Sequence, residues 1–311
     1  MTTTNSNNVL CDLSHLGLLE ISGADAVTFL QGQVTNDVKL LTGKNAHYTA
    51  YCNPKGRMLA LFLAFAHYDH LHLQLNRELL EPIMKRLKMY VMRSKVEIKD
   101  VSDSIIKFGL NGPQAASMLA PLFSTIPSQD YELVSLDNGS ILKLPSTNDN
   151  VRFVIFTDTS NAPLIWDALN ANCQLVEKPH WDWLEIQAGI PDITPVTQAQ
   201  FVPQMLNLDI LNGINFKKGC YTGQEIIART HYLGSIKRRT YLAETQTEVM
   251  PGDKVADAAQ SEVGQIVRSA PNLTGSFDVL AELRIDAAAA GELNCKGAAL
   301  NLKNLPYSLD A

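Results

Sequence analysis

The strongest constraint on the fold of this chain is the order in which short apolar strands and amphipathic helices follow one another over the first hundred residues. Ser22 caps a helix over GADAVTFLQGQV, and the turn NPKGR, with Pro54 and Gly56, joins two strands. The predicted strands are LGLLEIS (16–22), AHYTAYC, RMLALFLAF, LHLQL and SKVEIKD. Together with the helix RELLEPIMKRLKMY, these segments predict a β-α-β-β-α-β module with one extra strand.

A similar order follows over residues 104–172 and predicts a second module of related topology. Its strands are SIIKFGL, YELVSL, SILKLP and VRFVIFT, and its helices are GPQAASMLAPLF and APLIWDALNAN. HWDWLEIQAG (180–189) is expected to form a short helix. After about residue 236, short apolar strands separated by Gly, Pro and Asp predict a small antiparallel barrel or sandwich. The expected fold is therefore α+β, with domains at 1–100, 101–235 and 236–311.

The composition narrows the class of protein. At 311 residues and 46% hydrophobic content, the chain can bury the cores of two or three domains. The start, MTTTNSNNVLCDLSHL, is polar and has no basic segment before an apolar run, which argues against a secretory signal. No stretch approaches the roughly 18 apolar residues of a membrane span. We therefore expect a cytoplasmic protein.

Cysteine content and net charge exclude further classes of site. The five cysteines include no CxxC pair, which predicts reduced thiols and no metal site. The net charge of -6 gives no overall basic field, so strong direct nucleic-acid binding is not expected. The best local basic patch is Lys237, Arg238 and Arg239, which we interpret as a solvated strand edge.

The stretch NFKKGCYTGQEIIAR (215–229) contains a helix entrance. Thr222 and Glu225 match a capping box, in which the threonine caps the helix and the glutamate returns the bond. Tyr221 and Ile226 occupy the positions of a hydrophobic staple. This interpretation accounts for those four residues, but it leaves Lys218, Gly219, Cys220 and Gln224 without a role.

Cys220 has two interpretations from the residues alone. It would lie near the positive end of the following helix and near Lys217 and Lys218, and both features favour the thiolate. Nucleophilic catalysis usually needs a positioned base, however, and His231 is a full helix away. A small buried thiol at a tight helix entrance is the alternative.

The same stretch carries a resemblance to a known family. KKGCYTGQE followed by ARTHYLG resembles the signature of the YgfZ-type proteins, folate-binding relatives of the glycine cleavage T-protein that are associated with tRNA modification. Further segments are similar: QGQVTND (31–37), NPKGR (53–57), FVPQMLNLDILNGINFKKGC (201–220) and LPYSL (305–309). The resemblance therefore runs nearly from end to end of the chain.

The resemblance implies a T-protein-like fold. In that family, two α+β modules of βαββαβ type surround a central channel, and a small C-terminal β-barrel follows. The channel accepts a reduced folate, so tetrahydrofolate or a derivative is the implied cofactor. The resemblance also implies a role in tRNA methylthiolation, in the maintenance of iron–sulfur proteins and in contact with iron–sulfur tRNA-modifying enzymes. It places a functional cysteine at Cys220.

Two departures from the family limit what can be carried over. The T-protein has a pair of aspartates, one of them catalytic, where this chain has Ala60 and Leu61. Without a carboxylate there, glycine-cleavage aminomethyltransferase activity is not expected. Both families also tend to have a glutamate at the position of Gln187, where a carboxylate can accept hydrogen bonds from the pterin. The amide oxygen of Gln187 can accept such a bond only without charge assistance.

The resemblance also suggests which residues bind folate. Trp181 matches a family tryptophan proposed at the folate site, although core packing is its alternative role. A second family tryptophan is replaced by about Leu16. Lys218, Arg229 and Arg57 are candidates for binding anionic groups, and Arg229 can instead pair with Glu225 on the same helix.

We therefore expect a folate-binding accessory protein of tRNA modification or iron–sulfur protein maintenance. Whether it catalyses a reaction is left open by the residues. Two alternatives remain: a folate-dependent one-carbon transferase of unknown substrate, and an interaction scaffold for iron–sulfur assembly that binds no ligand.

Overall fold

The computed structural model describes residues 8–67, 69–147 and 150–309. Residues 1–7, which carry part of the argument against a secretory signal, lie outside these ranges. The chain divides into two compact units. Unit 1 comprises Met1–Val27, Lys39–His47 and Leu63–Trp181, and unit 2 comprises Thr28–Val38, Tyr48–Phe62 and Asp182–Ala311. The predicted domain boundaries near residues 100 and 235 stay a prediction.

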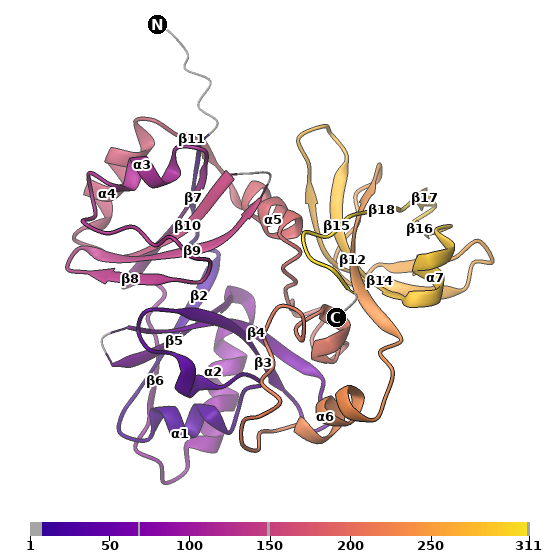
Figure 1. The fold of residues 1–311 in the computed structure, drawn as a ribbon, viewed down its shortest axis with the longest axis horizontal. Coiled ribbons are helices and arrows are strands. Elements are labelled where there is room, and N and C mark those ends of the chain that lie inside the picture. The colour runs from indigo at the N-terminus through magenta and orange to yellow at the C-terminus, as the bar shows by residue number, and fades with distance from the viewer. Residues whose placement is uncertain (1–7, 68, 148–149, 310–311) are drawn as a thin grey trace, which may run out of the picture. The chain divides into compact units, whose positions relative to one another are not determined.

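The first predicted module is confirmed as a five-stranded sheet in the order β3-β4-β5-β2-β6 (Figure 1). Its strands are β2 (Leu16–Ser22), β3 (Ala46–Cys52), β4 (Met58–His67), β5 (His70–Asn76) and β6 (Glu97–Asp100). Helix α1 (Ala26–Gln31) follows β2, and the short 3-10 helix η1 is Val38–Leu40. Residues of β3 and β4 belong to both units, so each strand links unit 1 to unit 2 through the chain.

Helix α2 (Arg77–Val91) packs against this sheet because its apolar residues fall on one face. Its buried residues are Leu79, Leu80, Ile83 and Leu87. A Cβ at Gly17 of β2 would lie 2.4 Å from a methyl carbon of Leu80, so the glycine permits the close approach of helix and strand. The side chain of Asn76 accepts a hydrogen bond from the Glu78 amide and begins the helix.

The second predicted module forms a six-stranded sheet of unit 1 in the order β11-β1-β7-β10-β9-β8. Its strands are β1 (Val9–Asp12), β7 (Ile105–Gly112), β8 (Leu133–Leu136), β9 (Gly139–Thr147), β10 (Asn150–Asp158) and β11 (Gln174–Val176). Helices α3 (Ala115–Leu119) and α4 (Ala162–Asn170) share a hydrophobic core with β7 and β10. Strands β1 and β11 are not predicted by the sequence analysis, because segments of four and three residues are too short to show an alternating apolar pattern.

The C-terminal strands of unit 2 form a seven-stranded sheet in the order β17-β16-β13-β14-β15-β12-β18, which curls into a nearly closed barrel-like form. Its strands are β12 (Arg238–Thr245), β13 (Lys254–Ala256), β14 (Glu262–Pro271), β15 (Phe277–Arg284), β16 (Asn294–Cys295), β17 (Ala298–Ala299) and β18 (Asn301–Lys303). Helix α7 (Ile285–Ala290) contributes to the apolar interior. The prediction of a small antiparallel barrel is confirmed.

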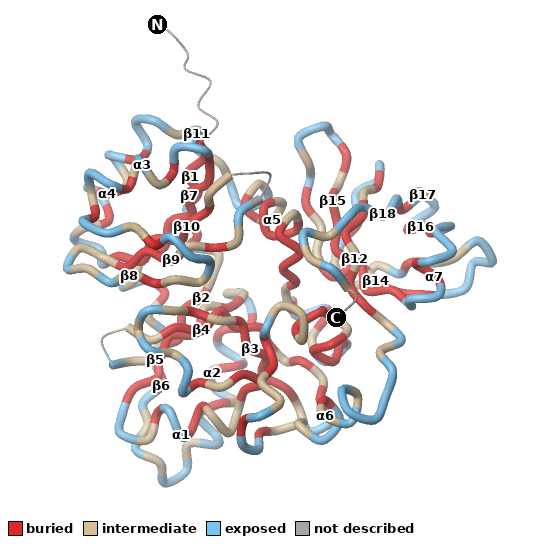
Figure 2. The backbone as a smooth tube through the Cα atoms, in the orientation of Figure 1, coloured by how far each residue is buried: buried red, intermediate tan, exposed pale blue. Residues whose placement is uncertain are grey.

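Three further elements connect the sheets. Helix α5 (Lys178–Gln187) matches the predicted short helix, and η2 (Pro203–Leu206) and α6 (Gln224–Tyr232) follow it in unit 2. Buried residues follow the strands of each sheet, whereas α6 is largely exposed (Figure 2). Within the described ranges, the helices are all too short or too polar to cross a membrane.

Candidate functional site

Cys220 is exposed on a loop of unit 2 that lies just before helix α6. The other four cysteines are buried or half-buried, and burial raises the pKa of Cys173 to about 11. The interpretation of Cys220 as a small buried thiol is therefore wrong. The thiol is presented to solvent on a segment whose two ends are both held in place.

Lys218 holds the first end of this loop. Its ammonium group donates hydrogen bonds to the backbone oxygens of Gln31, Val34 and Asn36 at 2.8, 2.5 and 2.9 Å. The ammonium also lies 4.9 Å from the centre of the Tyr221 ring. Burial lowers the pKa of Lys218 to about 8, so the group is still mainly charged at pH 7. Because its three protons are used within the protein, Lys218 acts here as an anchor for the loop.

The segment that receives Lys218 is itself joined to the chain before the loop. The Thr35 hydroxyl donates to the backbone oxygen of Gly213 at 2.7 Å, and the side-chain amide of Asn36 donates to the backbone oxygen of Asn212 at 2.7 Å. The Asn215 amide donates back to the Thr35 oxygen at 3.0 Å. The motif QGQVTND and the stretch before Cys220 therefore form one hydrogen-bonded unit, although they are far apart in the sequence.

Gly223 holds the second end of the loop. Its φ of 84° is in the left-handed region, and a Cβ there would lie 2.5 Å from the Asn53 oxygen and 2.9 Å from the Gly56 Cα. Gly56 is left-handed as well, and Ile226 lies over it. The NPKGR turn therefore packs directly against the helix entrance, and glycine at both positions makes room for it.

This contact overturns the predicted capping box. Helix α6 begins at Gln224 with Gly223 as its N-cap, and no side chain caps it. Thr222 is therefore one residue too early to cap. The physical reason is the left-handed turn at Gly223, which is set by the NPKGR loop and not by the local pattern of Thr222 and Glu225.

The fold brings a histidine back toward the loop. His231, at the end of α6, stacks on Phe216 with ring centres 3.7 Å apart and planes 11° apart. Tyr232 packs edge-on against His231 at 4.7 Å. Sequence analysis missed this cluster because Phe216 and His231 are separated by the whole loop and helix. The only indication in the sequence was that an aromatic residue stands near each end of the signature, Phe216 at the start and His231 at the end.

The two candidate arginines lie in unit 2 and differ in their surroundings. Arg57 donates a hydrogen bond from Nη1 to the Gln200 oxygen. Arg229 is exposed, and among the described residues no ion pair joins it to Glu225, so the proposed pairing along the helix is not formed. Among the candidate cations, the side chain of Arg229 therefore has the fewest interactions with other described residues.

Gln187, the last residue of α5, contacts the barrel sheet. Its amide nitrogen donates to Oδ2 of Asp278 on β15 at 2.7 Å, and Trp183 Nε1 donates to the same oxygen at 2.9 Å. Asp278 is 2% exposed, and Lys303 donates to its other oxygen at 2.8 Å. The contact orients the amide of Gln187 with its nitrogen toward Asp278, which leaves the amide oxygen to accept a bond.

Trp181 lies in the core of unit 1, with 1% of its surface exposed. A Cβ at Gly109 of β7 would fall 2.4 Å from the indole ring, and the guanidinium of Arg152 lies 5.7 Å from the ring centre. Of the two roles considered for Trp181, core packing accounts for these contacts. Its role in ligand binding stays a prediction.

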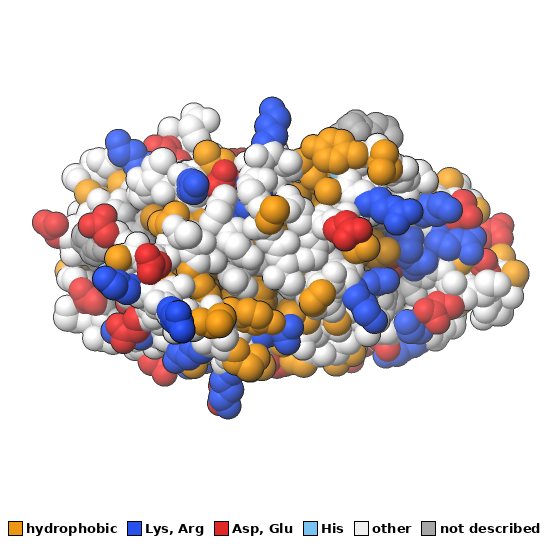
Figure 3. Space-filling model, turned by 90° about the horizontal axis from the view of Figure 1, so that it is seen from below, with side chains coloured by type: hydrophobic (Ala, Val, Ile, Leu, Met, Phe, Trp, Pro, Cys, Tyr) orange, Lys and Arg blue, Asp and Glu red, His pale blue; other side chains and the backbone are white. Residues whose placement is uncertain are grey.

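The predicted solvated basic edge at the start of β12 holds for Lys237, which is exposed, but is wrong for the two arginines. Arg239 is 7% exposed and binds Asp209 through two hydrogen bonds of 2.6 and 2.9 Å. Arg238 binds both carboxylate oxygens of Glu282. Each arginine is thus paired inside unit 2. On the face shown in Figure 3, Lys and Arg side chains are interspersed with Asp and Glu side chains.

Comparison with known proteins adds the family. A family model described as the GCVT N-terminal domain matches residues 1–174. The chain is 34% identical over 310 residues to the tRNA-modifying protein YgfZ of Yersinia pestis (strain Pestoides F), an alignment that covers 96% of this chain and 92% of the relative. The chain belongs to the YgfZ family. The YgfZ protein of Yersinia enterocolitica is also 34% identical, over 312 residues.

A solved structure confirms the fold of this YgfZ family member. The glycine cleavage system aminomethyltransferase T from Bartonella henselae superposes with a TM-score of 0.72 at 18% identity, over 98% of this chain and 87% of that one. At this identity, the likeness establishes the T-protein-like fold alone. Ala60 and Leu61 of β4 are both buried, so the structure has apolar side chains where the sequence analysis placed the T-protein aspartates.

Proposed function

We propose that this member of the YgfZ family is a reduced-folate-binding accessory protein of tRNA modification, and that Cys220 is its functional thiol. The observation that carries the proposal is the exposure of Cys220 on a loop fixed at both ends, by Lys218 on one side and by Gly223 against the NPKGR turn on the other. A thiol held in this way is accessible to a large partner and varies little in position.

The finer role that we propose is methylthiolation of tRNA, with an iron–sulfur tRNA-modifying enzyme as the partner. The relatives' name, tRNA-modifying protein, supports the general process. An exposed cysteine supports contact with a sulfur-handling enzyme, since thiols ligate and exchange with sulfur centres. Maintenance of iron–sulfur proteins would then be a consequence of the same contact.

The residues of unit 2 fit a reduced folate in part. The amide oxygen of Gln187 can accept a bond from the amino group of the pterin, because Asp278 fixes the nitrogen on the other side. Arg229 and Arg57 can bind the carboxylates of the glutamate tail. Lys218 does not fit this role, because its three protons are engaged. The folate itself would supply a one-carbon group.

The first experiment tests Cys220 in cells that lack their own copy of this protein. Methylthiolated nucleosides in tRNA are measured after complementation with wild type, Cys220→Ala or the matched control Cys173→Ala. We expect Cys220→Ala to behave like the deletion while its thermal midpoint is unchanged, and Cys173→Ala to restore the modification. Full complementation by a folded Cys220→Ala protein would refute the functional thiol.

The second experiment tests the folate. Purified protein is titrated calorimetrically with tetrahydrofolate and 5-formyltetrahydrofolate, beside Gln187→Leu, Arg229→Met and the control Arg284→Met. We expect saturable binding that Gln187→Leu weakens by about tenfold, the size of one lost hydrogen bond, and Arg284→Met leaves unchanged. Function that depends on Cys220 without folate binding would favour a ligand-free scaffold. Turnover of the folate with an acceptor would favour a one-carbon transferase.

A further inference from the structure

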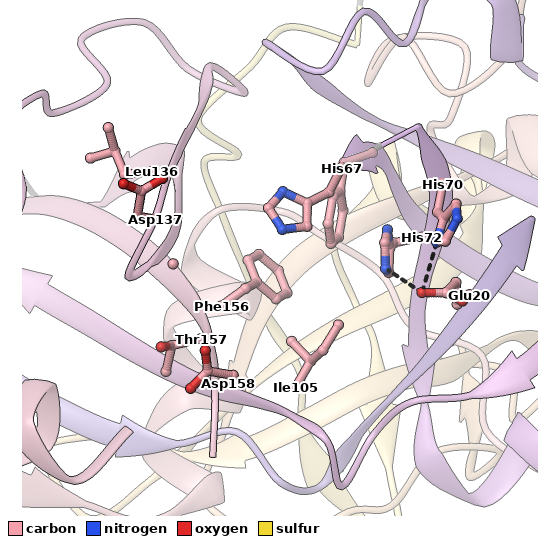
Figure 4. Close-up of a pocket in the computed structure, with 12 residues that line it drawn as sticks. Glu20, His67, His70, His72, Ile105, Leu136, Asp137, Phe156, Thr157 and Asp158 are labelled. Atoms are coloured by element: carbon pink, nitrogen blue, oxygen red, sulfur yellow. Dashed lines mark ion pairs between the residues drawn. The ribbon is translucent and has the colours of Figure 1, made fainter. Parts of the chain in front are cut away.

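Unit 1 contains a pocket that none of the preceding roles uses (Figure 4). Its volume is about 310 Å³, in the range of sites for small molecules. The lining comes from the ends of β2, β4, β5, β7 and β10 and from the turn between β8 and β9. Two sheets of unit 1 therefore contribute to one pocket.

The charges around this pocket are of one sign. Glu20, Asp137 and Asp158 line it, and its lining residues include no Lys or Arg. Outside the lining, Lys99 lies opposite Glu20 on the neighbouring strand; its hydrogen-bonded partner is Glu97 at 2.9 Å, and its electrostatic interaction with Glu20 is weaker. In Figure 4, Glu20 lies at one side of the pocket, and Asp137 and Asp158 lie at the opposite side.

Two of the three imidazoles that line the pocket, those of His67 and His72, are held in the neutral form by their surroundings. Burial, together with repulsion from His67, lowers the pKa of His72 to about 4, although Glu20 favours the charged form. Burial and the neighbouring His70 lower the pKa of His67 as well. Both rings are therefore mainly neutral at pH 7 and do not offset the negative charge of the carboxylates.

His72, beside Glu20 in the pocket, is a buried side chain whose ring nitrogens are not well hydrogen-bonded. The residue is 2% exposed, and within the described chain neither ring nitrogen has a hydrogen bond of normal geometry, although the backbone of His70 lies close enough to favour the charged ring. Its Nε2 lies 3.7 Å from the Glu20 carboxylate, whose other contact is His70 Nδ1 at 3.1 Å. A buried polar group is normally hydrogen-bonded, so this end of the pocket calls for a polar ligand group.

The region between the two acidic ends is apolar. Phe65 and Phe156 pack with ring centres 4.7 Å apart, and His72 stacks on Phe65 at 5.2 Å. Ile105 and Leu136 complete the wall. Aromatic faces attract cations and also accommodate methylene groups. A ligand that matches this lining has an apolar middle and a positive group at each end.

We propose that this pocket binds a small organic dication of the aliphatic diamine class. One ammonium group is held by Glu20 beside His72, the other by Asp137 with the charge of Asp158 nearby, and the methylene chain lies along Phe65, Phe156 and Ile105. The oxygens of Asp158 already accept bonds from Ser160 and Asn161, so Asp137 is the direct ligand at that end. The proposal is independent of folate and of Cys220.

The test is calorimetric titration of the full chain at low ionic strength with 1,4-diaminobutane, butylamine and butane-1,4-diol. We expect the diamine to bind at least tenfold more tightly than butylamine, and the diol not to bind. Glu20→Gln and Asp137→Asn should each weaken the diamine by at least fivefold. The control Glu81→Gln, an exposed carboxylate on α2, should leave it unchanged.

Two results would overturn the proposal. One is the absence of saturable diamine binding to the folded wild type, and the other is equal affinity for diamine and butylamine. Because Glu20 is partly buried, each variant is first checked for an unchanged near-ultraviolet circular dichroism spectrum. Asp137 lies exposed in a turn, so its variant keeps the test valid if Glu20→Gln unfolds.

Discussion

Asp278 accepts hydrogen bonds from four side chains. Two of its donors, Trp183 and Gln187, come from helix α5, and Lys303 comes from the last strand of the barrel sheet. Partial burial disfavours the ammonium of Lys303, yet its bonds to Asp278 and Glu244 raise its pKa. A buried carboxylate with this many donors depends on each of them.

The variant Gln187→Glu tests this dependence. The substitution removes the donor to Asp278 and places a second carboxylate beside it, so we expect a loss of roughly 2 kcal/mol in the free energy of unfolding at pH 7. The pair would hold a proton more tightly in the folded state, so the loss should shrink as pH falls. Urea denaturation at pH 7 and pH 5 measures both effects.

Gln187→Leu is the matched control, since it removes the bond without adding charge. A Gln187→Glu protein as stable as wild type would show that the contact with Asp278 contributes little. A carboxylate at this position would accept the hydrogen bonds of the pterin with charge assistance, so the family resemblance predicts that Gln187→Glu tightens folate binding. The same substitution loses the hydrogen bond to Asp278, so a loss of stability opposes the gain in folate affinity. Asp278 is far from Gln187 in the sequence, so the family resemblance did not reveal this contact.

The strands of the first sheet and the loop before helix α6 show what the sequence could and could not predict. Strands β2 and β3 are predicted to the residue, because each is a seven-residue apolar segment whose pattern is visible in the local sequence. The exposed position of Cys220 and the start of α6 were missed. Both depend on the contact of Gly223 with the NPKGR turn, and no local pattern around residue 223 contains that information.

The variants Gly223→Ala and Gly219→Ala compare the tightly packed end of the Cys220 loop with its open part. The first adds a Cβ to a left-handed residue 2.5 Å from the Asn53 oxygen, whereas a Cβ at Gly219 meets nothing within 4 Å. We expect Gly223→Ala to cost about 2 kcal/mol or more of stability and to change the rate at which Cys220 reacts with a thiol reagent. Gly219→Ala should have neither effect.

Thermal unfolding and the kinetics of thiol labelling give the two readouts for this pair of variants. If both glycine variants behave alike, the close packing of the NPKGR turn against the helix entrance does not hold the loop. Local flexibility of a glycine-containing segment would then be the better account of how Cys220 is presented.

The histidines with lowered pKa values, His67, His72 and His180, all lie in unit 1. Burial lowers the pKa of His180 as it does for His67 and His72. A histidine whose pKa is lowered by folding binds fewer protons in the folded state than it does in the unfolded chain. Its contribution to stability is therefore present above pH 6.5 and is lost as pH falls toward its folded pKa.

For His72, with a pKa of about 4, this loss amounts to about 2 kcal/mol between pH 7 and pH 5. Urea denaturation at the two pH values measures it. In His72→Gln we expect the pH dependence to decrease by that amount. A pH dependence that is identical in wild type and His72→Gln would contradict the assignment.

The hydrogen bonds of Lys218 also have a consequence for synthesis of the protein. They join residues 182 to 187 positions apart in the chain. At the usual rate of translation, the carbonyls of residues 31–36 leave the ribosome roughly 10 to 40 s before their lysine does. Contacts of such long range form late in folding. The segment that presents Cys220 can therefore become ordered only after more than two thirds of the chain has been made.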